Sequence, residues 1–106
     1  MIDIINVQDL KNKLQNNPSS LLIDCREQNE WEEVNIPNSK LMPLSQFEEL
    51  FKELKDTEQT IYIHCRSGQR SMKACQFLQD EGFENLYNVE GGILAWIAAD
   101  FETRSK

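Results

Sequence analysis

The spacing of hydrophobic residues changes along the chain, and these changes predict strands that alternate with helices. Short apolar or β-branched runs, typical of buried strands, occupy residues 2–5, 21–23, 61–63 and 86–89, with a shorter one near 40–42. In the longer segments between them, apolar residues recur at the three- and four-residue spacing of one buried helix face. This order is typical of an α/β sandwich, with a mainly parallel sheet and helices on both faces.

Polar and glycine residues mark the expected helix ends. Asn6 is suited to cap the first helix, and Gly82 follows the helix that begins at Ser71. Ser45, with a glutamate three residues later, has the capping-box pattern and predicts a helix whose apolar stripe reaches Leu54.

Composition is that of an ordinary globular chain. Of the 106 residues, 40% are hydrophobic and 27% are charged, and no apolar run approaches the ~20 residues of a membrane span. Neither an internal repeat nor a linker interrupts the pattern, so residues 1–106 are expected to form a single domain. Because the N-terminus lacks the basic and apolar regions of a signal peptide, we expect a cytoplasmic protein.

Charge and cysteine content narrow the classes of function. A formal net charge of −7 argues against nonspecific nucleic-acid binding. The same charge opposes an anionic substrate at long range, but screening over about 8 Å leaves the local charges of a site in control. Three cysteines without regular spacing and a single histidine argue against a disulfide framework or a metal site.

The strongest chemical signal lies at residues 61–71. The first three residues predict a buried strand, Gly68 permits a tight loop, and helical spacing follows, so Cys65 lies between a strand and a helix N-terminus. Backbone N–H groups and the helix dipole converge there, and Arg66 and Arg70 add two positive charges. The thiol should therefore ionise below the ~8.5 of free cysteine. A thiolate inside an anion-binding loop indicates an anionic substrate that is attacked by sulfur.

These residues carry a family resemblance. The sequence Cys-Arg-Ser-Gly-Gln-Arg at residues 65–70 resembles the active-site loop of single-domain rhodaneses, the thiosulfate sulfurtransferases. Asn35 and Cys25 depart from the family, which often has His and Val at these two places. Three further segments resemble the other family signatures in the right order, at residues 22–27 with Trp31, at 35–39 and at 88–96.

The resemblance implies a rhodanese-like three-layer sandwich and sulfur transfer. Cys65 would attack the outer sulfur of thiosulfate or of a related persulfide donor, release sulfite and become a persulfide. A thiophilic acceptor, such as cyanide, a thiol or a sulfur-accepting protein, would then take the sulfur. No cofactor, metal, nucleic acid or membrane is expected to take part. The predicted catalytic residue is Cys65, and the residues predicted to bind the substrate are Arg66, Ser67, Gly68, Gln69 and Arg70.

The remaining polar and sulfur residues favour structural interpretations. Asp24 and Arg26 leave a strand at its carboxyl end and are predicted to brace the loop as a pair. Cys25 and Cys75 could be redox thiols, but small buried side chains are the favoured interpretation. His64 precedes Cys65, and strand alternation points it to the opposite face from Ile63, which leaves its role open. We interpret it as structural.

Two other classes of function stay open at this point. The first is phosphatase or arsenate reductase chemistry. Rhodanese-like phosphatases have a longer loop, with five residues between cysteine and arginine, whereas Cys65 and Arg70 are separated by four. The shorter loop is expected to form a smaller cradle, which disfavours a phosphoryl group. A sulfur carrier or partner-binding module is the second alternative. Inactive modules of this kind lose the cysteine, and this chain keeps it.

Overall fold

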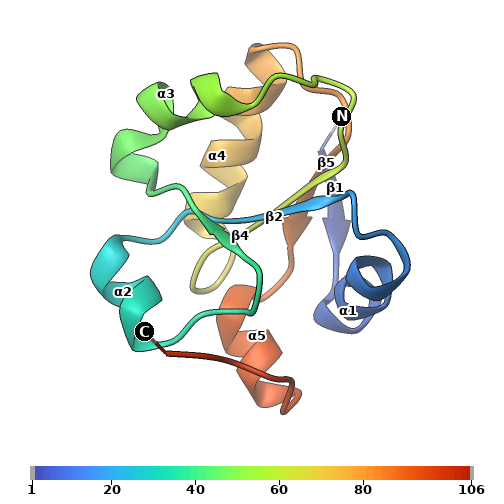
Figure 1. Cartoon of the computed structure of the whole chain (residues 1–106), viewed down its shortest axis with the longest axis vertical. Helices are drawn as coiled ribbons and strands as arrows, with labels where there is room; N and C mark the ends of the chain where they lie inside the picture. Colours follow the sequence, from blue (N-terminus) through green and yellow to red (C-terminus); the bar gives the residue numbers. More distant parts are fainter. Residues whose placement is uncertain (1, 106) are drawn as a thin grey trace.

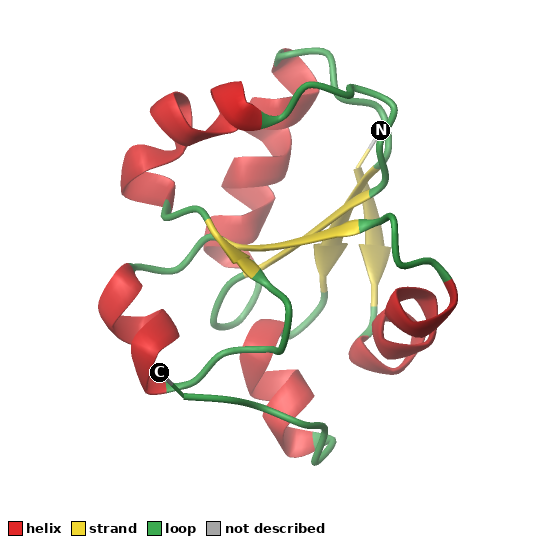
Figure 2. Cartoon of the chain, viewed as in Figure 1, coloured by secondary structure: helices red, strands yellow, loops and turns green. Residues whose placement is uncertain are grey.

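Five parallel strands form the sheet of this computed structural model, which describes residues 2–105 (Figures 1 and 2). In order across the sheet they are β1 (Ile2–Ile5), β5 (Leu86–Val89), β4 (Ile61–His64), β2 (Leu21–Asp24) and β3 (Lys40–Leu41). The helices are α1 (Val7–Asn16), α2 (Gln28–Glu33), α3 (Phe47–Leu50), α4 (Gln69–Asp80) and α5 (Gly92–Ala98). The predicted sequence of strands and helices is confirmed.

Strand alternation divides the core into two layers. Ile61 and Ile63 of β4 join one buried cluster, to which α3 and α4 contribute, and Tyr62 joins a second cluster with residues from α1 and α5. Figure 1 shows these two helix pairs on opposite sides of the sheet. The predicted α/β sandwich with helices on both faces is therefore confirmed.

The central position of β4 determines where the following loop emerges. β4 pairs with β5 on one side and β2 on the other, and its four residues are at most 3% exposed. The loop at residues 65–68 therefore leaves the middle of the sheet at its carboxyl edge, where parallel sheets bind ligands. The helix α2 follows β2 at the same edge (Figure 1).

The helix caps were predicted with mixed success. Asn6 caps α1 as expected, because its Oδ1 accepts the N–H of Asp9 at 2.8 Å. The capping box expected at Ser45 is wrong: the Ser45 hydroxyl donates instead to Oε1 of Glu27 at 2.8 Å. Glu27 and Glu30 form the observed capping box at the start of α2. The expected single helix is split into α3 and two flanking 3₁₀ turns, Leu44–Gln46 and Phe51–Glu53.

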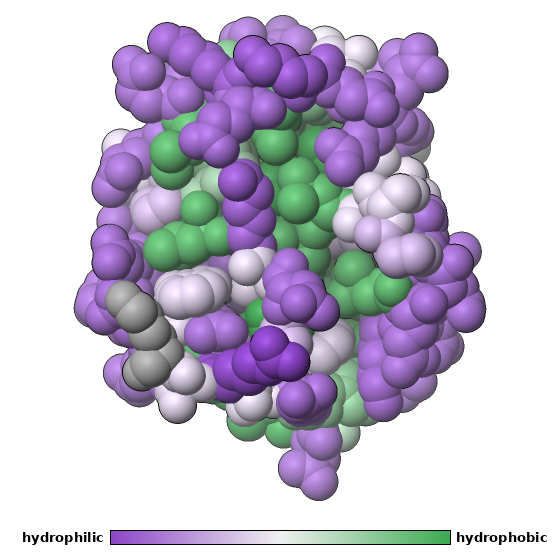
Figure 3. All heavy atoms as spheres, viewed as in Figure 1, coloured by the Kyte–Doolittle hydropathy of each residue, from purple (hydrophilic) through white to green (hydrophobic). Residues whose placement is uncertain are grey.

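Polar residues cover much of the outer surface of the helices. In the space-filling view, apolar atoms gather in the middle of one face and hydrophilic side chains surround them (Figure 3). Within residues 2–105 no helix is long and apolar enough to span a bilayer.

Candidate active site

Cys65 follows the last residue of β4 and lies at the base of a tight loop. Gly68 is the N-cap of α4 and has a left-handed φ of 114°, a conformation that glycine adopts at low cost. The loop thereby turns back over the sulfur, and the Cys65 residue is only 1% exposed. The nucleophile predicted from the sequence is thus placed at the N-terminus of a twelve-residue helix.

Several donors converge on the Sγ atom of Cys65. The N–H of Gly68 donates to it at 3.1 Å, and the Ser71 hydroxyl oxygen lies 3.4 Å away. Hydrogen bonds from the Cys25 thiol, from the Ser71 side chain and amide, and from the Gly68 amide lower the pKa of Cys65 to about 4, although burial opposes them. Cys65 is therefore a thiolate at neutral pH.

A hydrogen-bonded bridge from β5 supports this loop. The Ser71 hydroxyl donates to Oδ1 of Asn88, and Nδ2 of Asn88 donates to the carbonyl oxygen of Gly68 at 3.1 Å. Ser71 is fully buried and Asn88 is 6% exposed. The hydroxyl has one proton and reaches two acceptors, so it serves either Asn88 or the sulfur at a given moment.

The N-terminus of α5 binds the first two carbonyl groups of the loop. The Ile93 N–H donates to the carbonyl of Cys65 at 2.9 Å, and the Leu94 N–H donates to that of Arg66 at 3.2 Å. Gly92 allows this approach, because a Cβ atom there would collide with both carbonyl oxygens. With its carbonyls held by α5, the loop can turn N–H groups toward the sulfur.

The two loop arginines have different surroundings. Arg70 donates from both terminal nitrogens to the carboxylate of Glu30 on α2, at 2.7 and 3.0 Å. This bidentate pair lowers the pKa of Glu30 to about 2. Arg66 is exposed and lines a pocket of about 380 Å³ that also includes Ile93 and Leu94. Arg70 thus braces the loop against α2, whereas Arg66 faces solvent beside it.

A buried cluster of charged and polar side chains, Asp24, Arg26 and His64, lies at the carboxyl ends of β2 and β4. The Arg26 guanidinium binds the Asp24 carboxylate through two nitrogens, with a shortest distance of 2.8 Å, and reaches the Val34 carbonyl at 2.6 Å. The predicted bracing pair is therefore present. Nε2 of His64 lies 3.7 Å from Asp24, and burial lowers the pKa of His64. A neutral, buried His64 on the face opposite Cys65 agrees with the structural role expected from strand alternation.

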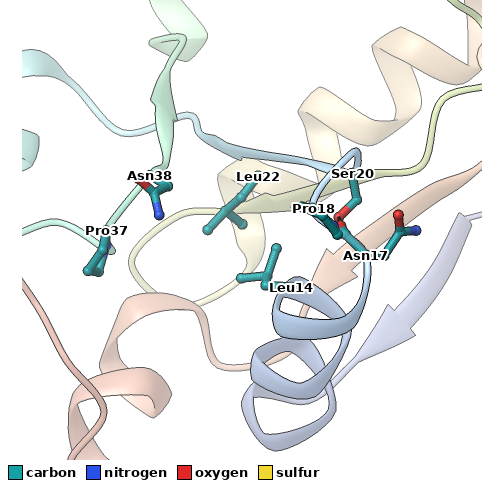
Figure 4. Close-up of a pocket in the computed structure, with 7 residues that line it drawn as sticks. All are labelled: Leu14, Asn17, Pro18, Ser20, Leu22, Pro37 and Asn38. Atoms are coloured by element: carbon teal, nitrogen blue, oxygen red, sulfur yellow. Dashed lines mark hydrogen bonds between the residues drawn. The ribbon is translucent and has the colours of Figure 1, made fainter.

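A second hollow is unsuited to the chemistry of the loop. It has a volume of about 260 Å³ and lies between α1, β2 and the turn at Pro37 and Asn38 (Figure 4). Its lining includes no cysteine, histidine or charged residue. Among residues 2–105, no group of three or more His, Cys, Asp or Glu is arranged to hold a metal ion.

Comparison with known proteins agrees with this geometry. Residues 6–99 match the rhodanese-like domain. The chain belongs to the rhodanese-like family. It is 36% identical over 102 residues to YtwF of Bacillus subtilis, which is named as a sulfurtransferase, with 96% of this chain and 94% of that protein covered.

Two further relatives support the same family and the same fold. The thiosulfate sulfurtransferase GlpE of Pseudoalteromonas translucida is 33% identical over 79 residues, which cover 74% of each chain. The crystal structure of a rhodanese-related protein from Thermoplasma volcanium has a TM-score of 0.87 and 31% identity, and the match covers 98% of this chain and 99% of that one. The family and the fold inferred from the sequence are thus confirmed.

The structure shows which parts of the rhodanese-like site the sequence predicted. The six predicted residues form the loop and the first two residues of α4, with Arg66, Ser67 and Gln69 exposed. Sequence reasoning missed Ser71 and Asn88, which lie in known motifs but were assigned to a helix face and a strand. Cys25 is a small buried side chain, as expected, and it lies in the same buried cluster as Cys65 and lowers the pKa of Cys65. Two polar residues in otherwise apolar elements, Asn88 in β5 and Ser71 just after the loop, could have indicated the hydrogen-bonded bridge.

We predict that Gly92→Ala removes most of the reactivity of Cys65 toward alkylating reagents and lowers the stability of the fold. The new methyl group must displace the carbonyls of Cys65 and Arg66, at a cost of about 1–3 kcal/mol for overpacking. Thermal unfolding and alkylation of Cys65 measure the two effects. Gly82→Ala is the matched control, since Gly82 also has a positive φ but open space around it. Equal loss of reactivity in both variants would contradict the role given to α5.

We also predict that the Cys65 thiolate titrates far below free cysteine. Alkylation should follow the thiolate fraction, so its rate should rise with pH through a midpoint near the pKa of about 4 and then stay level. Peptide mapping assigns the reaction to Cys65. Cys25→Val should raise the midpoint, because it removes a hydrogen-bond donor to the sulfur. Protein unfolded in urea is the control, and a folded-state midpoint at or above ~8.5 would refute the prediction.

Proposed function

We propose that this rhodanese-like protein moves the outer sulfur of thiosulfate, or of a related persulfide donor, to a thiophilic acceptor through a Cys65 persulfide. The observation that carries the proposal is the set of donors around Sγ of Cys65, which lowers its pKa to about 4. The membership of the sulfurtransferase family and the relative named thiosulfate sulfurtransferase support the choice of donor.

The first half-reaction forms the persulfide. The Cys65 thiolate attacks the outer sulfur of thiosulfate, a new S–S bond forms, and the S–S bond of thiosulfate breaks. Sulfite leaves with the electron pair of that bond, and the negative charge of the former thiolate remains on the new outer sulfur. Amides of the loop and the dipole of α4 stabilise this charge, because they point at the sulfur before and after the transfer.

The second half-reaction returns the enzyme to its starting state. An acceptor such as cyanide attacks the outer sulfur, and thiocyanate leaves while the electron pair of the S–S bond returns to Cys65. Neither step transfers a proton to or from carbon or oxygen, so no strong general base is required. This fits a loop whose residues between Cys65 and Arg70 include no carboxylate.

The positive groups have separate tasks in this proposal. Arg66 is exposed beside the loop and would bind the oxyanion end of the donor. Arg70 was expected to bind the substrate as well, but its guanidinium is engaged by Glu30. We therefore assign Arg70 to holding the loop and adding positive potential near the sulfur. Ser67 and Gln69 are exposed at the loop surface and remain candidate contacts of the donor.

We predict that Cys65→Ser reduces thiosulfate:cyanide transfer to background and leaves the fold intact. A serine hydroxyl is not ionised at neutral pH, so the nucleophile is lost while the volume hardly changes. Thiocyanate formation and intact mass after treatment with thiosulfate measure the two halves of the reaction. Cys75→Ala is the control and should keep most of the activity, because Cys75 is a core residue of α4. Substantial turnover by Cys65→Ser would rule out the proposed nucleophile.

The length of the loop should decide the substrate. Inserting one residue after Gly68 gives the five-residue spacing of phosphatase-like relatives and moves the amides away from Sγ. We expect that variant to lose thiosulfate:cyanide transfer, because the Gly68 N–H no longer reaches the sulfur. An equal insertion after Thr57, in an exposed turn, is the matched control and should retain activity.

Aryl-phosphate hydrolysis tests the competing function in the same proteins. The wild type should show no appreciable hydrolysis, because the loop is short and offers no acid for the leaving group. Efficient hydrolysis by the wild type would overturn the assignment, whatever its sulfurtransferase activity.

A further inference from the structure

Cys25 and Cys65 lie side by side on neighbouring strands. β2 and β4 pair in parallel with Asp24 opposite His64, so the next residue on each strand is in register with the other. The N–H of Cys25 continues this ladder by donating to the carbonyl of His64 at 3.0 Å. Both cysteines belong to the same buried cluster, on the face covered by α3 and α4. Their side chains therefore point the same way from adjacent backbone positions.

This register suits a bond between the two sulfur atoms. Neighbouring strands lie about 4.8 Å apart, and disulfides form between residues whose Cα atoms are about 4.4–6.8 Å apart. The two thiols influence each other's ionisation: Cys25 lowers the pKa of Cys65, and Cys65 raises the pKa of Cys25. Cys75 shares the cluster but lies on α4, outside the strand register that aligns Cys25 with Cys65.

We propose that Cys25 is a resolving thiol, which attacks the Cys65 persulfide and releases its outer sulfur as hydrosulfide. This inference rests on the proposed function, because that reaction forms the persulfide.

The step is balanced without an oxidant. The Cys25 sulfur attacks Sγ of Cys65, a Cys25–Cys65 bond forms, and the bond between Sγ and the outer sulfur breaks. The outer sulfur leaves with that electron pair and with the proton of Cys25, as hydrosulfide. The sulfane sulfur is reduced and the two cysteine sulfurs are oxidised to a disulfide.

Charge on Cys65 controls when Cys25 can react. In the free protein the hydrogen bond to Cys65, burial and the negative charge of Cys65 raise the pKa of Cys25, which keeps it protonated. When Sγ is bonded to a second sulfur, the negative charge moves to the outer sulfur. The interaction with the Cys65 sulfur and the repulsion by its negative charge then hold the proton on Cys25 less strongly. The proton can therefore pass to the departing sulfur.

An external dithiol closes the cycle by reducing the disulfide, which restores both thiols and oxidises the dithiol. The net reaction converts thiosulfate and a dithiol into sulfite, hydrosulfide and the oxidised dithiol. The chain would thus release sulfide when dithiols are present and transfer sulfur intact when a competing acceptor reaches the persulfide first.

The test follows the persulfide by intact mass under anaerobic conditions, after loading with thiosulfate and removal of the excess. The wild-type adduct of one added sulfur should decay to a species two hydrogens lighter than the starting protein, with one equivalent of sulfide released. Peptide mapping should show a Cys25–Cys65 disulfide. In Cys25→Ser, which keeps a hydrogen-bond donor, the adduct should last at least about tenfold longer and release no sulfide. Cys75→Ser is the matched control and should behave as the wild type.

Each other outcome has a defined meaning. Equal persistence of the adduct in the wild type and Cys25→Ser, or a disulfide to Cys75, overturns the role of Cys25. A chain that takes no sulfur from thiosulfate contradicts the proposed donor instead. The same three proteins loaded with inorganic polysulfide then decide the role of Cys25 separately, by the same comparison of adduct lifetimes. Circular dichroism of the variants shows whether each is folded.

Discussion

The hydrogen bonds from the N-terminus of α5 to the carbonyls of Cys65 and Arg66 are the constraint on which the site depends. A peptide group has a carbonyl and an N–H on opposite sides, so holding the carbonyls on one side leaves the loop free to present N–H groups on the other. Gly92 makes this contact possible because no side chain separates the two segments. The direction of the loop N–H groups thus depends on two helix N-termini, since α5 orients the loop that α4 completes.

A buried thiolate is stable only because this environment is prepared in advance. Burial opposes ionisation of Cys65, and in Cys75 burial together with the negative charge of Cys65 raises the pKa to about 12. The two cysteines lie in the same cluster, and the difference is that hydrogen bonds from Cys25, Ser71 and Gly68 surround only Cys65. Directed donors therefore outweigh burial at Cys65, whereas burial is the larger cause of the shift at Cys75.

Ion pairs around the loop serve geometry more than affinity for the substrate. The pair of Arg70 and Glu30 joins the start of α4 to α2. Arg26 binds Asp24 at the end of β2 and also donates to the carbonyl of Val34, just after α2. Both pairs are bidentate, a geometry that restrains orientation as well as distance. The loop is therefore held from α2, β5 and α5 at once, and Arg66 remains exposed at its mouth.

The sequence alone determined the sheet, the helix order and the position of the cysteine loop. The change in the spacing of apolar residues located β4 and α4, and the loop motif placed Cys65 between them. Both signals could be interpreted from the sequence because they depend on residues that are close together in the chain. The contacts of Ser45, Arg70 and Cys25 could not be obtained in this way. Ser45 meets Glu27, and Arg70 meets a glutamate forty positions away, so the fold had to bring the partners together.

Cys25 shows the same limit most clearly. The residues next to Cys25 in the sequence indicate only that it lies at the end of a strand, so the sequence predicts no more than a small buried side chain. The parallel register of β2 and β4, which depends on the whole sheet, places its sulfur beside that of Cys65. Local patterns therefore decided that Cys65 stands between a strand and a helix N-terminus, and tertiary pairing decided which groups surround it.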